Sequence, residues 1–176
     1  SITPSSELSE GLNSLTVKAT DAINNVSAAS SALSITVDTT APAKPEITTT
    51  TTLTSDTTPT IQGTAEAGST VTLFVDGVTT GITTTADGTT GIFSLTPLIA
   101  LEEGLNSLTV TATDAQGNTS SASSALSITV DTTAPAQPSI TTTTSLTNDS
   151  TPAIEGVAEA GSTVTLFVDG ETTVSY

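Results

Sequence analysis

The chain has 176 residues, of which 18 are acidic and two are basic, and its formal net charge at pH 7 is −16. It contains no histidine, cysteine, methionine or tryptophan, which excludes imidazole or thiolate catalysis, zinc sites of Cys and His, and disulfide bonds. The charge predicts no binding to nucleic acids or anionic membranes, and a supply of oxygen ligands alone favours hard cations, Ca²⁺ above all.

The sequence repeats itself with a period of 93 residues. When the chain is aligned with itself at this offset, 61 of the 83 overlapping positions are identical. A period of this length predicts a tandem array of similar domains. Three segments return at the offset: residues 38–42 (DTTAP) at 131–135, residues 66–77 (EAGSTVTLFVDG) at 159–170, and residues 10–17 (EGLNSLTV) at 103–110.

The repeat divides the chain into three parts. Residues 1–37, the head segment, correspond to the C-terminal part of a preceding repeat, and residues 38–130 form one complete repeat. Residues 131–176, the tail segment, correspond to the N-terminal part of a following repeat. The head and tail segments together lack only the counterpart of residues 84–93. We therefore expect one whole domain between two partial ones.

Within the complete repeat, apolar residues alternate with Thr and Ser, which predicts strands that have one buried face. Asp-Gly and Gly-Asn pairs supply the turn signals between them. No segment has a helical period, so the pattern predicts an all-β chain of tandem immunoglobulin-like antiparallel β-sandwiches. In chain order, the predicted strands of the complete repeat are 45–51, 59–65, 69–75, 78–84, 91–96, 105–113 and 123–130.

Because successive strands run in opposite directions, their loops fall at two ends of the sandwich. We call the end at which the linker 38–44 arrives the linker end, and the other the far end. The linker end is predicted to hold loops 66–69, 86–91 and 114–121, and the far end loops 53–57, 76–77 and 97–104.

Three acidic residues are expected to meet at the linker end. Asp38 lies in the linker, Glu66 begins the loop after the second strand, and Asp114 begins the loop before the last strand. Three carboxylates brought together repel one another unless a cation lies between them, and Ca²⁺ accepts six to eight oxygen ligands. The sequence therefore predicts a Ca²⁺ site. The alternative is that Asp114 caps its own turn and Glu66 is a solvated loop acid.

The matching acids at the next junction are Asp131 and Glu159, and the chain offers the third only as Asp21 in the head segment. We expect Asp21 of another molecule to complete that second Ca²⁺ site. Two incomplete sandwiches expose sheet edges and half a core, which favours strand exchange. The sequence therefore predicts head-to-tail self-association, in which the tail segment of one chain completes the head segment of the next.

Acids at the far end have simpler explanations. Asp56 precedes a strand in an Asp-x-Thr-Pro sequence and is predicted to cap a turn. Asp76 forms an Asp-Gly pair of the kind found in tight hairpins. The adjacent acids Glu102 and Glu103 have no aromatic cleft around them, so catalysis is not expected.

Residues 38–42, 65–71 (AEAGSTV) and 112–118 (ATDAQGN) resemble the signatures of bacterial Ig-like repeats in large type I-secreted (RTX-type) adhesins. The resemblance covers the whole chain. It implies stalk modules that stack end to end, with Ca²⁺ at their junctions. One position departs from the pattern: the head segment has Asn24 where the complete repeat has Gly117. Asn tolerates the left-handed conformation, so the turn is expected to survive.

The resemblance implies a non-enzymatic extender of an adhesin on the bacterial cell surface, which supports biofilm formation or attachment and has neighbouring repeats of the same chain as its partners. No apolar run approaches the roughly 18 residues of a membrane helix, so membrane insertion is not expected. No secretory leader is recognisable, so any export signal is expected outside this sequence. Two alternatives stay open: a module that binds a glycan or another adhesin, for which Phe74 is a candidate contact, and a subunit of a head-to-tail surface fibre.

Overall fold

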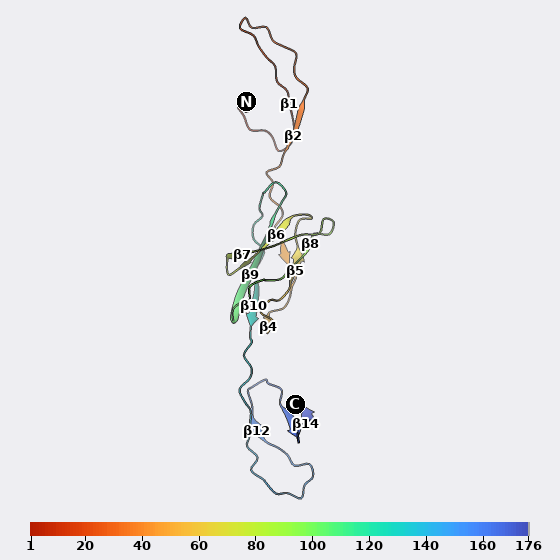
Figure 1. The fold of residues 1–176 in the computed structure, drawn as a ribbon, viewed down its shortest axis with the longest axis vertical. Helices are drawn as coiled ribbons and strands as arrows, with labels where there is room; N and C mark the ends of the chain where they lie inside the picture. Colours follow the sequence, from red (N-terminus) through yellow and green to blue (C-terminus); the bar gives the residue numbers. More distant parts are fainter. Residues whose placement is uncertain (176) are drawn as a thin grey trace. The chain divides into compact units, whose positions relative to one another are not determined.

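The computed structural model describes the backbone of residues 1–175 and the side chains of residues 1–170. The chain forms two compact units, Ser1–Asp131 and Thr132–Tyr176. In the described part, every regular element is a strand, from β1 to β14 (Figure 1). This confirms the all-β prediction. No helix long and apolar enough to cross a membrane occurs among these residues.

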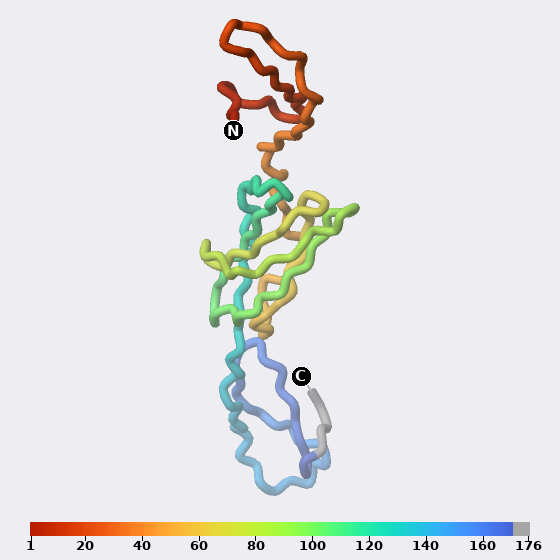
Figure 2. Tube along the Cα trace, turned by 45° about the horizontal axis from the view of Figure 1, so that its top comes forward, coloured from red at the N-terminus to blue at the C-terminus, as the bar shows by residue number. Residues whose placement is uncertain are grey.

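The complete repeat folds as a sandwich of two sheets, which Figure 2 shows as the part of the tube coloured from orange to cyan. Adjacent strands run antiparallel, except for β10 and β4, which are parallel. The five-stranded sheet has the order β4 (Leu53–Thr54), β10 (Leu126–Val130), β9 (Gly104–Thr113), β6 (Thr70–Val75) and β7 (Val78–Thr85). The three-stranded sheet has the order β3 (Glu46–Ile47), β5 (Ile61–Thr64) and β8 (Ile92–Leu95).

The first predicted strand, 45–51, is too long, because only β3 (Glu46–Ile47) lies within it, and β4 (Leu53–Thr54) lies in the predicted loop 53–57. β3 pairs with β5, and then the Thr48 N–H donates to the Gln62 carbonyl at 2.9 Å as the chain leaves that sheet. On the other sheet, the Thr129 N–H donates to the Thr52 carbonyl at 2.8 Å, next to β4. The threonine run is thus a crossing between sheets and only partly a strand.

The core lies between the two sheets and consists of the alternating apolar residues predicted from the sequence. Phe93 is its largest side chain and is 2% exposed. It packs over Gly63, where a Cβ would collide with the Phe93 ring and the Glu46 carbonyl. The other members that are at most 3% exposed and belong to strands are Ile61, Val71, Leu73, Leu95, Leu108, Val110, Ala112, Ile128 and Val130.

The loops sort onto two ends as predicted. At the linker end, the Ala86 N–H donates to the Ser69 carbonyl at 2.9 Å, which joins the loop after β5 to the loop after β7. At the far end, the Leu101 N–H donates to the Thr57 carbonyl at 2.8 Å, which joins the loop after β4 to the one after β8. These main-chain bonds fix each group of loops as one surface.

Two turn predictions are confirmed by the backbone. Asp76 and Gly77 link β6 to β7 with φ values of 50° and 78°, as a two-residue hairpin turn requires. Asn24 has a φ of 70° where the complete repeat has Gly117 at 93°. Asn therefore replaces Gly in the left-handed conformation and the turn is preserved.

The head and tail segments keep the local pairings of the complete repeat. In the head, β1 (Gly11–Leu15) pairs with β2 (Leu33–Val37) in the register of β9 with β10. In the tail, the pairs are β11 (Ser139–Ile140) with β12 (Gly156–Val157) and β13 (Thr165–Val168) with β14 (Glu171–Ser175). Each of these sheets has only two strands among the described residues.

Candidate functional site

The loop between β9 and β10 is organised by the carboxylate of Asp114. Its Oδ1 accepts hydrogen bonds from the N–H groups of Gln116 and Asn118, both at 2.9 Å, and its Oδ2 accepts one from Asn118 Nδ2 at 2.8 Å. Burial raises the pKa of the Asp114 carboxyl, but the hydrogen bonds from Asn118 and from the loop backbone outweigh it and hold the pKa below its usual value. Asp114 thus caps its own turn, the role that the sequence analysis gave as the alternative to a Ca²⁺ ligand.

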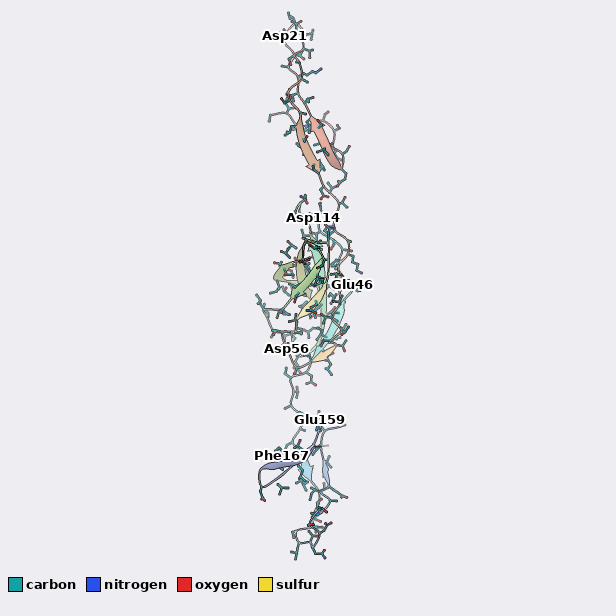
Figure 3. The ribbon with its side chains drawn as sticks, turned by 90° about the vertical axis from the view of Figure 1, so that its right-hand side faces the viewer. Asp21, Glu46, Asp56, Asp114, Glu159 and Phe167 are labelled. Atoms are coloured by element: carbon teal, nitrogen blue, oxygen red, sulfur yellow. The ribbon has the colours of Figure 1, made fainter. Side chains whose placement is uncertain are left out.

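Asn118 also joins this loop to the linker. Its Nδ2 donates a second hydrogen bond, 3.1 Å long, to the main-chain carbonyl of Asp38. The Asp38 carboxylate accepts the Thr40 N–H at 3.1 Å, so it shapes the linker itself. Figure 3 places Asp114 and Asp56 at opposite ends of the complete repeat, which puts the contact at the linker end.

Glu10 of the head segment holds the same stretch of linker. Its carboxylate accepts the Thr39 N–H at 3.1 Å, the Thr39 hydroxyl at 2.7 Å and the Thr40 hydroxyl at 3.3 Å. The hydrogen bonds from Thr39, that of its side chain foremost, lower the pKa of the Glu10 carboxyl. Residues 38–40 are therefore hydrogen-bonded both to the head segment and to the complete repeat.

The three acids predicted to form the first Ca²⁺ site are only partly brought together. Asp38 and Asp114 share the Asn118 amide as a donor. Glu66 lines a hollow with Ala43 and Lys44, and its carbonyl accepts the Ser69 N–H at 3.1 Å. The described residues contain no group of three or more acids placed to hold one metal ion. Ca²⁺ binding here stays a prediction.

Asp21, of the second predicted set, lies at the tip of the β1–β2 hairpin (Figure 3). Its carboxylate accepts the N–H groups of Ile23 at 3.0 Å and Asn25 at 2.9 Å, and the Asn25 Nδ2 at 2.9 Å. The hydrogen bonds from Asn25, that of its side chain first, lower the pKa of the Asp21 carboxyl. The turn is thus a copy of the one around Asp114.

The other two members of that set lie in different units. Asp131 continues from β10, and its N–H donates to the Thr54 carbonyl at 2.9 Å. Glu159 lies in the second unit, where its Oε2 accepts the Ala136 N–H at 3.1 Å. The repeat counterparts of Glu159 and Ala136 are Glu66 and Ala43, which line one hollow. In both repeats, therefore, this glutamate lies beside its own linker.

The role of Glu10 was missed by the sequence analysis. Glu10 and Thr39 are 29 positions apart, and neither type of residue marks a contact by itself. Their recurrence was visible, because Glu10-Gly11 returns at 103–104 and Thr39-Thr40 at 132–133. Only the fold shows that this glutamate and these threonines meet.

Two acids at the far end have structural roles, and that of Asp56 was predicted from the sequence. Asp56 Oδ1 accepts the Thr58 N–H at 2.8 Å and thus caps the turn before β5. Asp76 Oδ1 accepts the Ser107 N–H at 2.9 Å from the neighbouring strand β9. These carboxylates are occupied with main-chain donors, which explains their presence without a ligand.

The comparisons with known proteins identify the kind of fold. Residues 46–132 match the family model of the bacterial Ig-like domain. This match covers the sandwich described above and confirms the predicted immunoglobulin-like fold. No curated protein sequence matches the chain.

Two solved structures are similar at lower identity. The fibronectin(III)-like modules of Clostridium thermocellum CbhA are 20% identical, with a TM-score of 0.37, over 49% of this chain and 94% of theirs. The BSP domain of a biofilm associated protein is 24% identical, with a TM-score of 0.41, over 72% of this chain and 20% of that chain. The present chain thus spans about a fifth of the second structure's length.

Proposed function

We propose that the chain is a structural extender of a bacterial surface adhesin: a non-enzymatic stalk segment, outside the cell, that supports biofilm formation or attachment. The observation that carries this proposal is the linker held from both sides. Glu10 binds residues 39–40 from the preceding repeat, and Asn118 binds Asp38 from the following one. The 93-residue repeat, the match to a bacterial Ig-like domain and the motifs that resemble adhesin stalks support it.

A stalk must resist bending at its linkers, and several features of this linker favour stiffness. The hydrogen bonds of Glu10 and Asn118 restrict residues 38–40, and Pro42 and Pro45 fix their own φ angles. The complete repeat also carries nine acids against one lysine, so neighbouring repeats of this composition repel each other and favour extension.

Ca²⁺ at the linker end is part of the proposal. The Asp38 carbonyl and the Asp114 carboxylate both accept hydrogen bonds from the Asn118 amide, so two oxygens lie close to the same nitrogen. Oxygen atoms of this kind are the ligands that Ca²⁺ takes. When bound, Ca²⁺ would neutralise carboxylates; Asp38, Asp114 and Glu66 are the proposed ligands at this junction, and Asp131, Glu159 and Asp21 are their counterparts at the next.

The stiffness of the linker is testable with spin labels, because the chain has no cysteine to compete for them. Labels at Ser31→Cys and Ser121→Cys, both exposed, report the distance between head segment and complete repeat. The parent protein is expected to give a narrow distance distribution, and Glu10→Ala a broader one, because Thr39 and Thr40 lose their acceptor.

The matched control is Glu7→Ala, which removes an exposed acid from the same segment and should leave the distribution narrow. A parent protein with a broad distribution would count against the stalk proposal. Equal broadening by both substitutions would show that charge, and not the Glu10 hydrogen bonds, sets the linker's stiffness.

A further inference from the structure

Strand β10 of the complete repeat is paired on its outer side over only part of its length. Near the far end, the Thr129 N–H donates to the Thr52 carbonyl at 2.8 Å. The next such bond runs from the Asp131 N–H to the Thr54 carbonyl at 2.9 Å. Nearer the linker end, none of the described residues continues the line of β4, because residues 48–49 are bonded to the other sheet. The crossing between the sheets therefore leaves an open edge on the five-stranded sheet.

The open edge carries main-chain groups that are not used within the sandwich. Alternate residues of a strand turn their N–H and C=O groups to the same side, so those of Ser127 face outward like those of Thr129. Ser107, which lies opposite Ser127 on β9, forms its main-chain bonds with Asp76 on its other side. On the outer side, neither Ser127 nor Ala125 has a hydrogen-bond partner in the described part of the chain. Such an edge is a template for an added strand.

A hollow of about 340 Å³ lies beside this edge. One wall consists of residues 44–47, from the linker and β3, and the other of residues 124–126. Pro45 is buried, and Ile47 and Leu126 are half-buried, so part of the wall is apolar. Successive side chains of a strand point to opposite faces. A strand added along β10 would therefore direct one of its side chains into this hollow.

The edge is already formed without a partner. The Ser123 hydroxyl accepts the Val110 N–H at 3.0 Å, and the Ser120 hydroxyl accepts the Ala112 N–H at 2.9 Å. Both serines are buried, and their hydroxyls bond to β9 where the chain before β10 is not a regular strand. A partner would therefore not have to order this edge on binding, and preorganisation of this kind favours affinity.

The charges around the hollow favour a basic partner. Glu46 lines this hollow and also the neighbouring one that Glu66 lines. Lys44 lines both as well, and its Nζ donates to the Ser124 hydroxyl at 3.3 Å. The complete repeat carries nine acids against this one lysine. The field of such a surface attracts cations and repels acidic segments.

Independently of the stalk role, we infer that the open edge of β10 is a docking site for an extended, basic peptide segment of another protein. The segment continues the line of β4, forms main-chain hydrogen bonds with Ala125 and Ser127, and places one apolar side chain in the hollow. In this mode of recognition, main-chain bonds give affinity and the side-chain pocket gives specificity. Figure 3 shows Glu46 at the side of the complete repeat, between Asp114 and Asp56, so the site lies on the flank of the sandwich.

Nuclear magnetic resonance of the full, ¹⁵N-labelled chain tests the inference with a defined probe. The probe is an N-acetylated, C-amidated peptide in which valine alternates with lysine. The amide signals of Ala125 and Ser127 should shift with saturation as the peptide is added, and their hydrogen exchange should become slower. Added NaCl should weaken the binding, because it screens the attraction between charges.

Two further peptides separate the contributions. A peptide with glutamate in place of lysine should not bind, because the surrounding acids repel it. A lysine peptide that is N-methylated at every second residue keeps its charge and loses the N–H donors. It should bind about tenfold more weakly, as the loss of one or two net hydrogen bonds implies.

Protein variants test the edge from the other side. Ser127→Pro removes the outward N–H, which the sandwich does not use, and should lose the peptide response at Ala125. Ser127→Ala is the matched control, since it keeps this N–H and should bind like the parent. Glu46→Gln should weaken binding severalfold, whereas Asp56→Asn, the same charge change at the far end, should not. Thermal unfolding followed by circular dichroism checks that each variant is folded.

Four results would overturn the inference. The first is the absence of any shift at Ala125 and Ser127 in the parent protein. The second is equal binding of the lysine peptide and its N-methylated form, since charge alone would then hold the peptide. The third is equal binding of the glutamate peptide. The fourth is a shift of the same signals with protein concentration alone, which would make a second copy of the chain the occupant of the edge.

Discussion

Several loops of this chain are each held by one aspartate, whose carboxylate accepts N–H groups of its own loop. Asp87, in the loop between β7 and β8, accepts the N–H groups of Thr89 at 3.0 Å and Thr90 at 2.7 Å, and the Thr90 hydroxyl at 2.8 Å. Asp21 and Asp114 hold their own loops through the same kind of bonds. A carboxylate that receives several N–H groups is stabilised in its charged form, so folding and ionisation are linked.

Acid should therefore weaken the fold through Asp87. The hydrogen bonds from Thr90, that of its backbone first, lower the pKa of the Asp87 carboxyl from its ordinary value of 3.8. A group with a lowered pKa in the folded state adds stability above its unfolded pKa, and this stability is lost as the pH falls through the folded pKa. The midpoint of thermal unfolding should thus fall as the pH is lowered below about 4.

The variant Asp87→Asn should be less stable at neutral pH and should lose less stability on acidification, because Asn does not titrate. Thr89→Ala keeps its backbone N–H and should retain the pH profile of the parent. If Asp87→Asn has a parental pH profile, the ionised carboxylate does not contribute to stability at this loop.

At the scale of elements, the sandwich depends on how closely β3, β5 and β8 approach. Gly63 in β5 leaves the space into which the Phe93 ring packs. The substitution Gly63→Ala should destabilise the complete repeat by about 1–3 kcal/mol, the usual cost of overpacking a core. Urea unfolding measures this difference through the midpoint of the transition.

Gly88→Ala is the matched control, since a Cβ at that position meets nothing within 4 Å. It should change the midpoint little. Equal effects of both substitutions would show that backbone freedom, and not the space beneath Phe93, is what glycine provides in β5.

The strands of the complete repeat were largely predictable, because burial of one face imposes an alternating pattern. The second predicted strand, 59–65, contains β5, and the sixth, 105–113, nearly coincides with β9. The shortness of β3 and the position of β4 in a predicted loop were not predictable. Threonine favours strands wherever it occurs, and the crossing depends on main-chain bonds to residues that are distant in the sequence, such as Thr129.

The candidate site shows the same limit. Asp38 and Asp114 were predicted to lie at one end because strand direction alone decides which loops share an end. The role of Asn118 as a donor to both residues was not foreseen, and neither was the contact of Glu10 with the linker. Contacts between a linker and its neighbours depend on the directions in which side chains point. The periodicity of the sequence does not predict these directions.

At the scale of the molecule, repulsion among the acids is the main force to be balanced. With a net charge of −16 and two basic residues, the chain can pair few carboxylates internally. Cations from solution must supply the rest, either as a diffuse atmosphere or at fixed sites. These two modes respond differently to ion type, because diffuse screening depends on ionic strength and a fixed site selects by size and ligand number.

Thermal unfolding in Ca²⁺, in Mg²⁺ at matched ionic strength, and in excess chelator separates these modes. A ligand that binds only the folded state stabilises it by about 2.7 kcal/mol at a hundredfold excess over its dissociation constant. A rise in Tm specific to Ca²⁺ is expected. Asp114→Asn should remove most of the response, because Asp114 is a proposed ligand, whereas Asp56→Asn makes the same charge change at the far end and should keep it.

Each of the other outcomes would assign a different role to the acids. Equal responses to Ca²⁺ and Mg²⁺ would mean that screening alone controls the acids, and the stalk would then depend on the Glu10 and Asn118 contacts for its stiffness. Loss of the response in Asp56→Asn would move the site to the far end. No response to either ion would remove the metal from the mechanism and leave a metal-free spacer or a ligand-binding module. A narrow distance distribution that Glu10→Ala broadens would then favour the spacer.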